Sequence, residues 1–180
     1  MEPEQVVLID DAGVPIGVAD KSTVHGPQTP RHLGFSCYGV DPTGRLLVTQ
    51  RSRHKRTFPL LWTNTCCGHP GPGERPEDAV RRRLRDELGL QALDLRLVLP
   101  DFSYRASLHG IEENELCPVF VCTLEGDPRP DPAEVEDWQW WPWSRFLDEC
   151  DTAAGALSPW ARMQAPLLSE RGGPLHAEAA

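Results

Sequence analysis

The segment from Gly68 to Leu90 constrains this chain more than any other part of its sequence. It reads as a loop, a helix and a second loop. Pro76 suits the first turn of a helix, where the missing N–H of proline costs nothing. Apolar residues recur every four positions from Val80 to Leu88, which is typical of a helix with one buried face. Gly89 then suits the left-handed residue that ends a helix. We therefore predict a helix over residues 76–88.

The charged residues of this segment resemble the Nudix box, in which several Glu side chains hold Mg²⁺ against a diphosphate. Two positions depart from that pattern: Arg83 stands where the box has the Glu after its Arg, and Asp86 replaces the first Glu of a pair. The reversed charge at Arg83 argues against hydrolysis but leaves the fold intact. Glu87 can still reach a Mg²⁺ bound to a diphosphate. The residues that match directly are Gly68, Glu74, Arg82, Leu84, Glu87, Gly89 and Leu90.

The same charges have a simpler interpretation as surface ion pairs. On a helix, Arg82 would face Asp86 and Arg83 would face Glu87, four positions apart. Such pairs are common, and Glu87 alone would not distinguish the two interpretations. Gly68, Glu74 and Gly89 stand at the spacing of the box, and they favour the Nudix interpretation.

The remaining pattern indicates a mixed α/β (α+β) chain, with a mixed β-sheet flanked by helices, as in the Nudix fold. We expect residues 1–180 to form a single Nudix-type domain, with residues 171–180 as a flexible tail. Alternating apolar residues and turn signals place the other elements. The predicted strands are residues 5–9, 14–19, 32–40, 46–50, 63–68, 95–99, 116–124 and 138–141, and the other helices are residues 144–149 and 160–170.

Composition excludes several classes of protein. A net charge of -9 at pH 7 disfavours binding to nucleic acid or to an anionic membrane, so a phosphate site must be a local basic patch. No apolar run is long enough to span a membrane, and Met1-Glu2-Pro3-Glu4 lacks the start of a signal peptide. We therefore expect a cytoplasmic monomer whose cysteines are reduced.

A scattered set of three histidines and two glutamates has the composition of a metal site: His25, His32, His69, Glu113 and Glu115. The two glutamates flank Asn114, and residues two apart in an extended segment point to the same side. Imidazole and carboxylate ligands together suit Mn²⁺ or Zn²⁺ better than Mg²⁺. Any single histidine is more often a surface or core residue than a ligand.

Two further segments carry candidate functional groups. In the extended stretch before His69, the thiol of Cys67 points to the same side as the imidazole, and a metal-held histidine would favour its ionisation. Cys66 is expected to be a small buried residue. The basic run from Arg51 to Arg56, with Lys55 inside it, follows a predicted strand and could close over an anion. A solvated charged loop explains that run equally well.

Blocks along nearly the whole chain, from about Val6 to Gln164, resemble the type I isopentenyl-diphosphate isomerase family in order and content. Together they are much more specific than the Nudix box. They are Lys21, His25, Arg31-His32-Leu33, Trp62-Thr63-Asn64, Cys67-Gly68-His69-Pro70, Asp101-Phe102-Ser103-Tyr104-Arg105, Glu113-Asn114-Glu115 and Ser158-Pro159-Trp160.

This resemblance implies an enzyme of isoprenoid biosynthesis that interconverts isopentenyl and dimethylallyl diphosphates through a carbocation-like intermediate. Our hypothesis is that Glu115, with Tyr104, protonates the double bond, and that Cys67 takes the proton from the neighbouring carbon. The opposite assignment stays open. By the same resemblance, the diphosphate is held by Mg²⁺ on Glu87 and the Cys67 backbone. The substrate-binding side chains are Lys21, Arg51, Lys55, Arg83 and Trp160, the last facing the cation.

Two other functions remain open on the sequence: a Nudix hydrolase of nucleoside or prenyl diphosphates, and a non-catalytic module that binds a diphosphate. Arg83 argues against the first, and the second has little need of Cys67 and Glu115. The sequence leaves open which metal the histidines hold, the oligomeric state, and whether longer prenyl chains are accepted.

Overall fold

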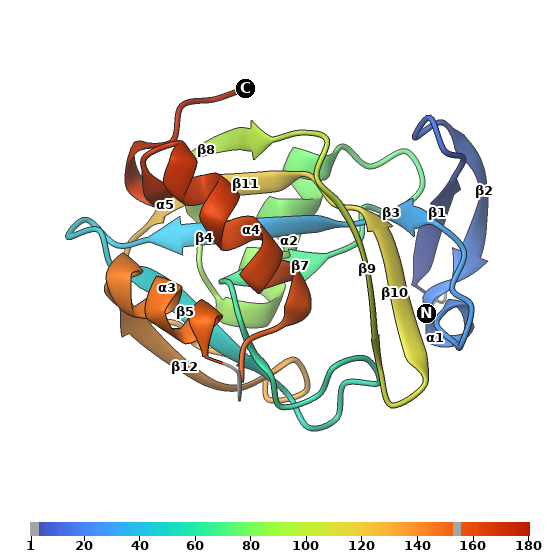
Figure 1. Ribbon diagram of the computed structural model, residues 1–180, viewed down its shortest axis with the longest axis horizontal. Coiled ribbons are helices and arrows are strands. Elements are labelled where there is room, and N and C mark those ends of the chain that lie inside the picture. Colours follow the sequence, from blue (N-terminus) through green and yellow to red (C-terminus); the bar gives the residue numbers. More distant parts are fainter. Residues whose placement is uncertain (1–3, 153–155) are drawn as a thin grey trace.

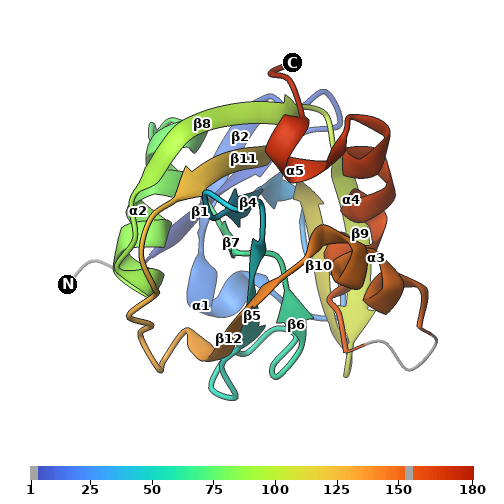
Figure 2. The same cartoon turned by 90° about the vertical axis from the view of Figure 1, so that its left-hand side faces the viewer.

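The computed structural model describes residues 4–152 and 156–180. The expectation about a signal peptide, which rests on residues 1–3, therefore lies largely outside the described part. Two β-sheets lie next to each other, and helices cover both faces of the larger one (Figures 1 and 2). The predicted α+β class, with mixed sheets flanked by helices, is confirmed.

The larger sheet runs in the order β12-β5-β4-β11-β8, with two short strands, β6 and β7, paired to β5 and β4. The pair β4–β11 is parallel and the other pairs are antiparallel, so the sheet is mixed. The bounds are β4 Phe35–Val40, β5 Leu46–Arg51, β6 Trp62–Thr63, β7 Cys66–Gly68, β8 Ala92–Leu99, β11 Val119–Leu124 and β12 Val135–Trp141.

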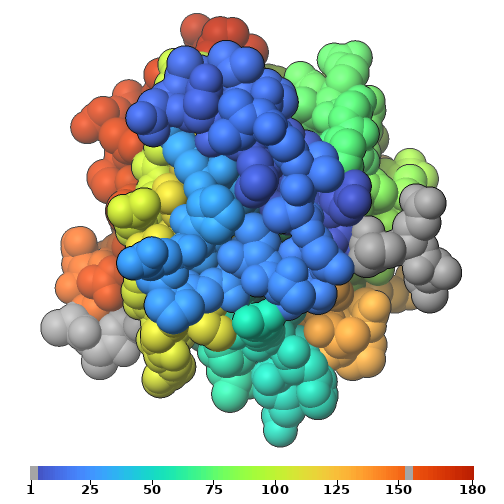
Figure 3. Space-filling model, turned by 90° about the vertical axis from the view of Figure 1, so that its right-hand side faces the viewer, coloured from blue at the N-terminus to red at the C-terminus, as the bar shows by residue number. Residues whose placement is uncertain are grey.

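The smaller sheet has the order β2-β1-β3-β10-β9 and lies at one end of the molecule (Figure 1). In Figure 3, the N-terminal segment with the β1–β2 hairpin (blue) forms much of one face of the molecule, next to the β9–β10 hairpin (yellow). A short helix, α1 (Lys21–Val24), follows β2. The bounds are β1 Gln5–Ile9, β2 Pro15–Asp20, β3 His32–Leu33, β9 Ser103–Leu108 and β10 Ile111–Leu116.

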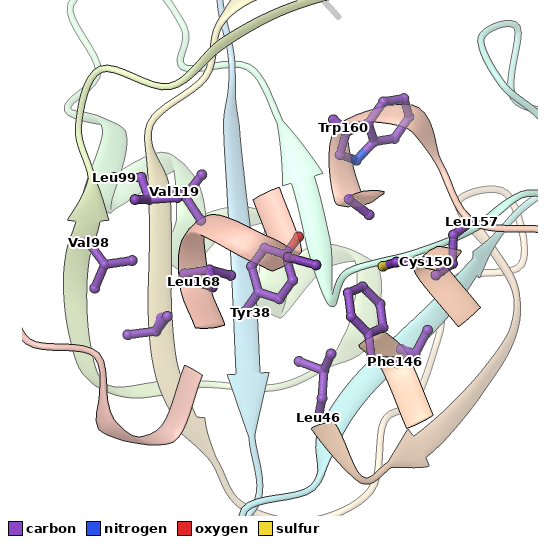
Figure 4. Close-up of a cluster of buried hydrophobic side chains, with 14 of the residues drawn as sticks. Tyr38, Leu46, Val98, Leu99, Val119, Phe146, Cys150, Leu157, Trp160 and Leu168 are labelled. Carbon is purple, nitrogen blue, oxygen red and sulfur yellow. The ribbon is translucent and has the colours of Figure 1, made fainter. Parts of the chain in front are cut away.

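Helices on the two faces of the larger sheet give the protein two hydrophobic cores. Helix α2 (Pro76–Leu88) lies on one face, and α3 (Trp143–Asp151), α4 (Pro159–Glu170) and α5 (Gly173–His176) lie on the other (Figure 2). In the core between the sheet and helices α3 and α4, Tyr38 of β4 faces Phe146 of α3 and Leu168 of α4 (Figure 4).

The prediction of a helix over residues 76–88 is confirmed at both ends. Gly89 has the left-handed conformation, with φ of 66°, and its N–H closes the last turn on the carbonyls of Arg85 and Leu84. The apolar stripe from Val80 to Leu88 is fully buried against the sheet. The periodicity of the sequence thus fixed which face of this helix turns inward.

The predicted strand over residues 32–40 is in fact two strands, β3 and β4, in different sheets. The chain changes sheets at Gly34, whose N–H donates to the carbonyl of Leu116 at 2.9 Å. A Cβ at this position would lie 2.1 Å from Glu115 Oε2, so any other residue would displace the Glu115 carboxylate. The predicted strand over residues 116–124 divides similarly, into the end of β10 and β11, with Pro118 between them.

Strand β9 was not predicted, and the last ten residues differ from the expected flexible tail. Helix α5 forms inside that segment, and Ala177 is fully buried in the core. Arg96 of β8 donates to the carbonyl of Ala177, and the N–H of Ala180 donates to the carbonyl of Leu97 at 2.8 Å. Small apolar residues of this C-terminal segment pack into the core, which the sequence does not reveal.

Within the described ranges, no helix combines the length and apolar character needed to cross a membrane.

Substitution of Gly39 in β4 tests the packing of the central sheet. A Cβ at Gly39 would lie 2.3 Å from Leu124 Cδ1 in the core, so Gly39→Ala should destabilise the fold by about 1–3 kcal/mol through overpacking. Gly17→Ala is the matched control, because a Cβ at Gly17 meets no atom within 4 Å. Urea unfolding of both variants measures the difference; equal stabilities would contradict this account of the core.

Candidate active site

A cavity of about 410 Å³ opens where the two sheets meet. One end is lined by histidines, carboxylates and the Cys67 thiol, and the other by basic side chains. Of the residues selected from the sequence, eleven line it: Lys21, His25, Arg51, Lys55, Cys67, His69, Arg83, Tyr104, Glu113, Glu115 and Trp160. His32 lies behind this wall, fully buried, and Glu87 is buried next to Arg83. The fold therefore gathers segments that are far apart in the sequence.

Strand pairing explains how three of these residues meet. Glu115 of β10 lies opposite His32 of β3 on one side and opposite Tyr104 of β9 on the other. Side chains at directly opposed positions of neighbouring strands lie on the same face of the sheet, about 5 Å apart. One row across the smaller sheet thus carries an imidazole, a carboxylate and a phenol.

The histidines and glutamates form one compact cluster. Ligand atoms of His25, His32, His69 and Glu113 all lie within 4.8 Å of one another. His25 Nε2 is 2.9 Å from Glu113 Oε2, and His69 Nε2 is 2.9 Å from Glu115 Oε1. His25 Nε2, His32 Nε2 and Glu113 Oε2 are buried, and their mutual approaches of 2.9 and 3.8 Å do not have the geometry of hydrogen bonds. Such atoms are costly to bury unpaired, and a divalent ion among them would satisfy all three.

The protonation states in this cluster suit cation binding. Burial opposes ionisation of Glu115, but hydrogen bonds from His32 and His69 outweigh burial and hold its pKa well below the usual range. Burial lowers the pKa of His69 to about 4, so its imidazole is neutral near pH 7. A neutral imidazole and an ionised carboxylate are the forms that bind a metal.

Cys67 lies on β7, in the cavity wall, and is only partly buried, whereas the other five cysteines, all within the described residues, are buried. Its Sγ is 3.2 Å from Asn64 Oδ1 and 3.5 Å from Ser36 Oγ. Burial raises the pKa of the Cys67 thiol, although Ser36 and Arg51 oppose that change. A raised pKa keeps this group a thiol near pH 7. The easier ionisation expected beside a metal-held histidine stays a prediction. Cys66 is buried, as predicted.

Two carboxylates, Glu4 and Glu134, lie among the basic side chains of the cavity, and no sequence motif marks them. Glu4 lies 3.0 Å from Lys21 Nζ, and Glu134 forms an ion pair with Lys55. Arg83 is within 3.5 Å of Glu4 and 3.3 Å of Glu134. Nothing in the local sequence distinguishes these two glutamates from surface residues, because their importance depends on which cations the fold brings to them.

The Nudix-like segment divides into a structural part and a part near the cavity. Arg82 donates twice to Glu74 at 2.8 Å and so ties the loop to α2, rather than pairing with Asp86. Arg83 does pair with Glu87, the i,i+4 contact that the simpler interpretation expected. Glu87 is thus buried next to Arg83, which lines the cavity.

Aromatic rings close the wall between the two ends. The rings of Tyr104 and Trp160 are 5.6 Å apart, and the Arg51 guanidinium lies 5.3 Å from the centre of the Trp160 ring. Burial, and then the charge of Glu115, raises the pKa of Tyr104 well above its usual value, so this phenol keeps its proton. The cavity combines proton-carrying groups, π faces and an anion-binding end.

Comparisons with known proteins agree with this geometry. The NUDIX domain family matches residues 30–161. A Deinococcus radiodurans protein has a TM-score of 0.69 at 20% identity, covering 89% of this chain and 96% of its own. The MutT protein of Methanosarcina mazei has a TM-score of 0.66 at 17% identity, covering 79% of this chain and 96% of its own. The fold is therefore that of a Nudix domain.

Curated relatives narrow the class further. An isopentenyl-diphosphate Delta-isomerase of Mycolicibacterium vanbaalenii is 54% identical over 94% of this chain and 93% of its own length. One of Saccharopolyspora erythraea is 51% identical over 94% of this chain and 88% of its own length. The chain belongs to the isopentenyl-diphosphate Delta-isomerase family, as its resemblance to that family predicted.

Removal of one imidazole tests the metal cluster. His25→Ala should weaken Mn²⁺ or Zn²⁺ binding by about 100-fold or more, since even the loss of an outer partner of a metal ligand costs 10- to 100-fold. His54→Ala is the matched control, because His54 lines the same cavity but lies outside the cluster. Calorimetric titration measures both affinities, and unchanged binding by His25→Ala would remove His25 from the site.

Proposed function

We propose that this protein interconverts isopentenyl diphosphate and dimethylallyl diphosphate, in isoprenoid biosynthesis. The observation that carries the proposal is the shared cavity of Cys67 and Glu115 with a basic end, in a chain 54% identical to a protein of that name. The cavity, about 410 Å³, is within the size range of small-ligand sites. A five-carbon chain would lie between the thiol and the carboxylate, with its diphosphate among the basic residues.

The reaction is an addition of one proton and a removal of another. The π electrons of the terminal double bond take a proton at the CH₂ carbon, which leaves a tertiary cation on the branched carbon. A base then removes a proton from the neighbouring CH₂, and the electrons of that C–H bond form the new double bond. No net redox change occurs, so the chain needs only a donor and an acceptor on either side of the substrate.

Cys67 and Glu115 are the candidate donor and acceptor. We propose that Glu115, with Tyr104 beside it, protonates the alkene, and that Cys67 accepts the second proton. In the free protein Cys67 is a protonated thiol and Glu115 an ionised carboxylate. Under this assignment, these protonation states start the reverse reaction, from dimethylallyl to isopentenyl diphosphate. They are equally the states that start the forward reaction under the opposite assignment. Trp160 would present its π face to the cation, and the buried wall would exclude water that could trap it.

The basic end would bind the diphosphate through Lys21, Arg51, Lys55 and Arg83. Ammonium groups act as point charges, whereas guanidinium groups offer a fork of donors to phosphate oxygens. We also propose that Mg²⁺ enters with the diphosphate and is held by Glu87 and the backbone carbonyl of Cys67. The position of Glu87 next to Arg83, which lines the cavity, supports this assignment, although Glu87 must then share its charge between Arg83 and the ion.

The second cation, Mn²⁺ or Zn²⁺, would be held by the histidines with Glu113 and Glu115. Bound there, it supplies positive charge that stabilises the ionised form of the carboxylates. Its other contribution is structural, because the ligands come from four separate segments: His25 after α1, His32 on β3, His69 after β7, and Glu113 and Glu115 on β10. We further propose a cytoplasmic monomer without a nucleic-acid partner, in keeping with its acidic net charge.

Turnover in deuterated water tests the proposed reaction. With Mg²⁺, Mn²⁺ and isopentenyl diphosphate, we expect dimethylallyl signals that carry deuterium, and an intact diphosphate by phosphorus NMR. Cys67→Ala should abolish turnover while the fold persists by circular dichroism. Release of phosphate or pyrophosphate would instead identify a hydrolase, and unchanged spectra with bound substrate would identify a binding module.

Reversal of the charge at Arg83 tests why a Nudix fold would bind a diphosphate without cleaving it. Arg83→Glu places a fourth carboxylate beside Glu4, Glu87 and Glu134, so we expect KM for isopentenyl diphosphate to rise by about tenfold or more, or 1.4 kcal/mol. Arg85→Glu makes the same charge change at an exposed position of α2 and is the control. Efficient pyrophosphate release by Arg83→Glu would show that this position alone separates the two chemistries.

A further inference from the structure

Two hydrogen-bonded chains connect helix α4 to the sulfur of Cys67. In the first, Asn64 Oδ1 accepts from Cys67 Sγ at 3.2 Å and from Trp160 Nε1 at 3.2 Å. In the second, Gln164 Nε2 donates to Ser36 Oγ at 3.0 Å, and Ser36 Oγ lies 3.5 Å from the same sulfur. Asn64 and Ser36, which have no part in the proposed reaction, therefore hold the thiol from two sides.

The side chain of Asn64 has only one possible orientation. Its Nδ2 donates to the backbone carbonyls of Cys37 and Cys66, both at 2.9 Å, and the residue is fully buried. Two carbonyl oxygens require the NH₂ group on that side, which turns Oδ1 toward the thiol and the indole. One buried oxygen atom thus links Cys67 to Trp160, whose Nε1 also donates to Thr63 Oγ1 at 3.0 Å.

Helix α4 presents both chains from one side. Trp160 and Gln164 are four residues apart, which places them on the same face of the helix. The start of that helix is anchored as well, because Ser158, its N-cap, is hydrogen bonded to Thr63 Oγ1 at 2.8 Å. Figure 4 shows Trp160 on this helix, above Tyr38 of the sheet, whose hydroxyl donates to Gln164 Oε1 at 2.8 Å. The helix cannot shift without disturbing the contacts of the thiol.

We propose that Asn64 and Ser36 are positioning residues, which hold the Cys67 sulfur in a fixed place relative to the Trp160 indole. The inference rests on the proposed function, in which the sulfur exchanges a proton with the substrate and the indole faces the cation. Proton transfer to or from carbon demands close alignment, and a displacement of about 1 Å can cost about 100-fold in rate. Asn64 and Ser36 act through Cys67 and Trp160 rather than on the substrate.

This role has a stereochemical consequence. The CH₂ carbon that loses a proton carries two hydrogens, which a fixed acceptor distinguishes by position. A sulfur held by Asn64 and Ser36 should take only one of them, whereas a loosely held sulfur should take either. A residue that merely stabilised the fold would change the amount of active protein and leave this selection intact.

The test uses isopentenyl diphosphate carrying deuterium at one of the two positions of that CH₂ carbon. We expect wild-type protein to retain or lose the label completely. In Asn64→Ala, kcat should fall by about 100-fold, with KM within about threefold of wild type, because the diphosphate end is untouched. The dimethylallyl product of this variant should be a mixture of labelled and unlabelled molecules, as measured by mass spectrometry.

Thr65→Ala is the matched control. Thr65 is the next residue, equally buried, and its hydroxyl donates to the carbonyl of Leu47 at 2.7 Å and accepts from the N–H of Gly39 at 2.7 Å, away from Cys67 and Trp160. It should lose stability yet keep kcat and full selection. If Asn64→Ala does not fold, Ser36→Ala removes the other contact of the sulfur and is judged by the same criteria.

Three outcomes would overturn the inference. Wild-type selection and rate in the folded Asn64→Ala or Ser36→Ala variant would show that the sulfur needs no such support. An equal loss of kcat and selection in Thr65→Ala would assign the effect to general packing. A wild-type protein without any turnover would overturn the proposed function and this inference together, whereas the first two outcomes leave the proposed function standing.

Discussion

The burial of the Glu115 carboxylate among imidazoles is the interaction on which the rest of the site depends. An ionised carboxylate without partners is very costly to bury, and Glu115 is accommodated because His32 and His69 lie within 3.5 Å of it. Those contacts come from the parallel pairing of β3 with β10, and the Glu115 carboxylate lies directly against the backbone at Gly34. A substitution of Gly34 would therefore displace Glu115 and disturb the cluster of histidines and glutamates.

The two ends of the cavity use opposite electrostatic arrangements. At the histidine end, the ionised carboxylate of Glu115 and the neutral imidazole of His69 suit a divalent cation. At the other end, cations outnumber the carboxylates Glu4 and Glu134, and the excess positive charge suits a diphosphate. The apolar wall with Tyr104 and Trp160 separates them, so a short hydrocarbon chain would bridge two polar regions without being polar itself.

The Nudix scaffold is thus adapted rather than replaced. Its loop and helix are held as a rigid unit by the Arg82–Glu74 pair and by the Gly89 end of α2. Arg83 converts a position that serves cation binding in the Nudix box into one that carries a positive charge toward the cavity. In the proposed function, the basic end binds the diphosphate, and Cys67 of the larger sheet exchanges protons with the substrate together with Glu115 and Tyr104 of the smaller sheet.

The sequence by itself determined the helix over residues 76–88, most of the strands and eleven of the twenty-one residues that line the cavity. Local periodicity and turn residues specify the elements, and the family resemblance specified Cys67, Tyr104 and Glu115. Only the tertiary structure decided that residues 32–40 divide between two sheets, and that the C-terminal residues pack as a helix. It also revealed Glu4, Glu134, Asn64 and Ser36. The partners of Glu4, Glu134 and Ser36 are distant in the chain, as is the contact of Asn64 with Trp160, so no local pattern encodes them.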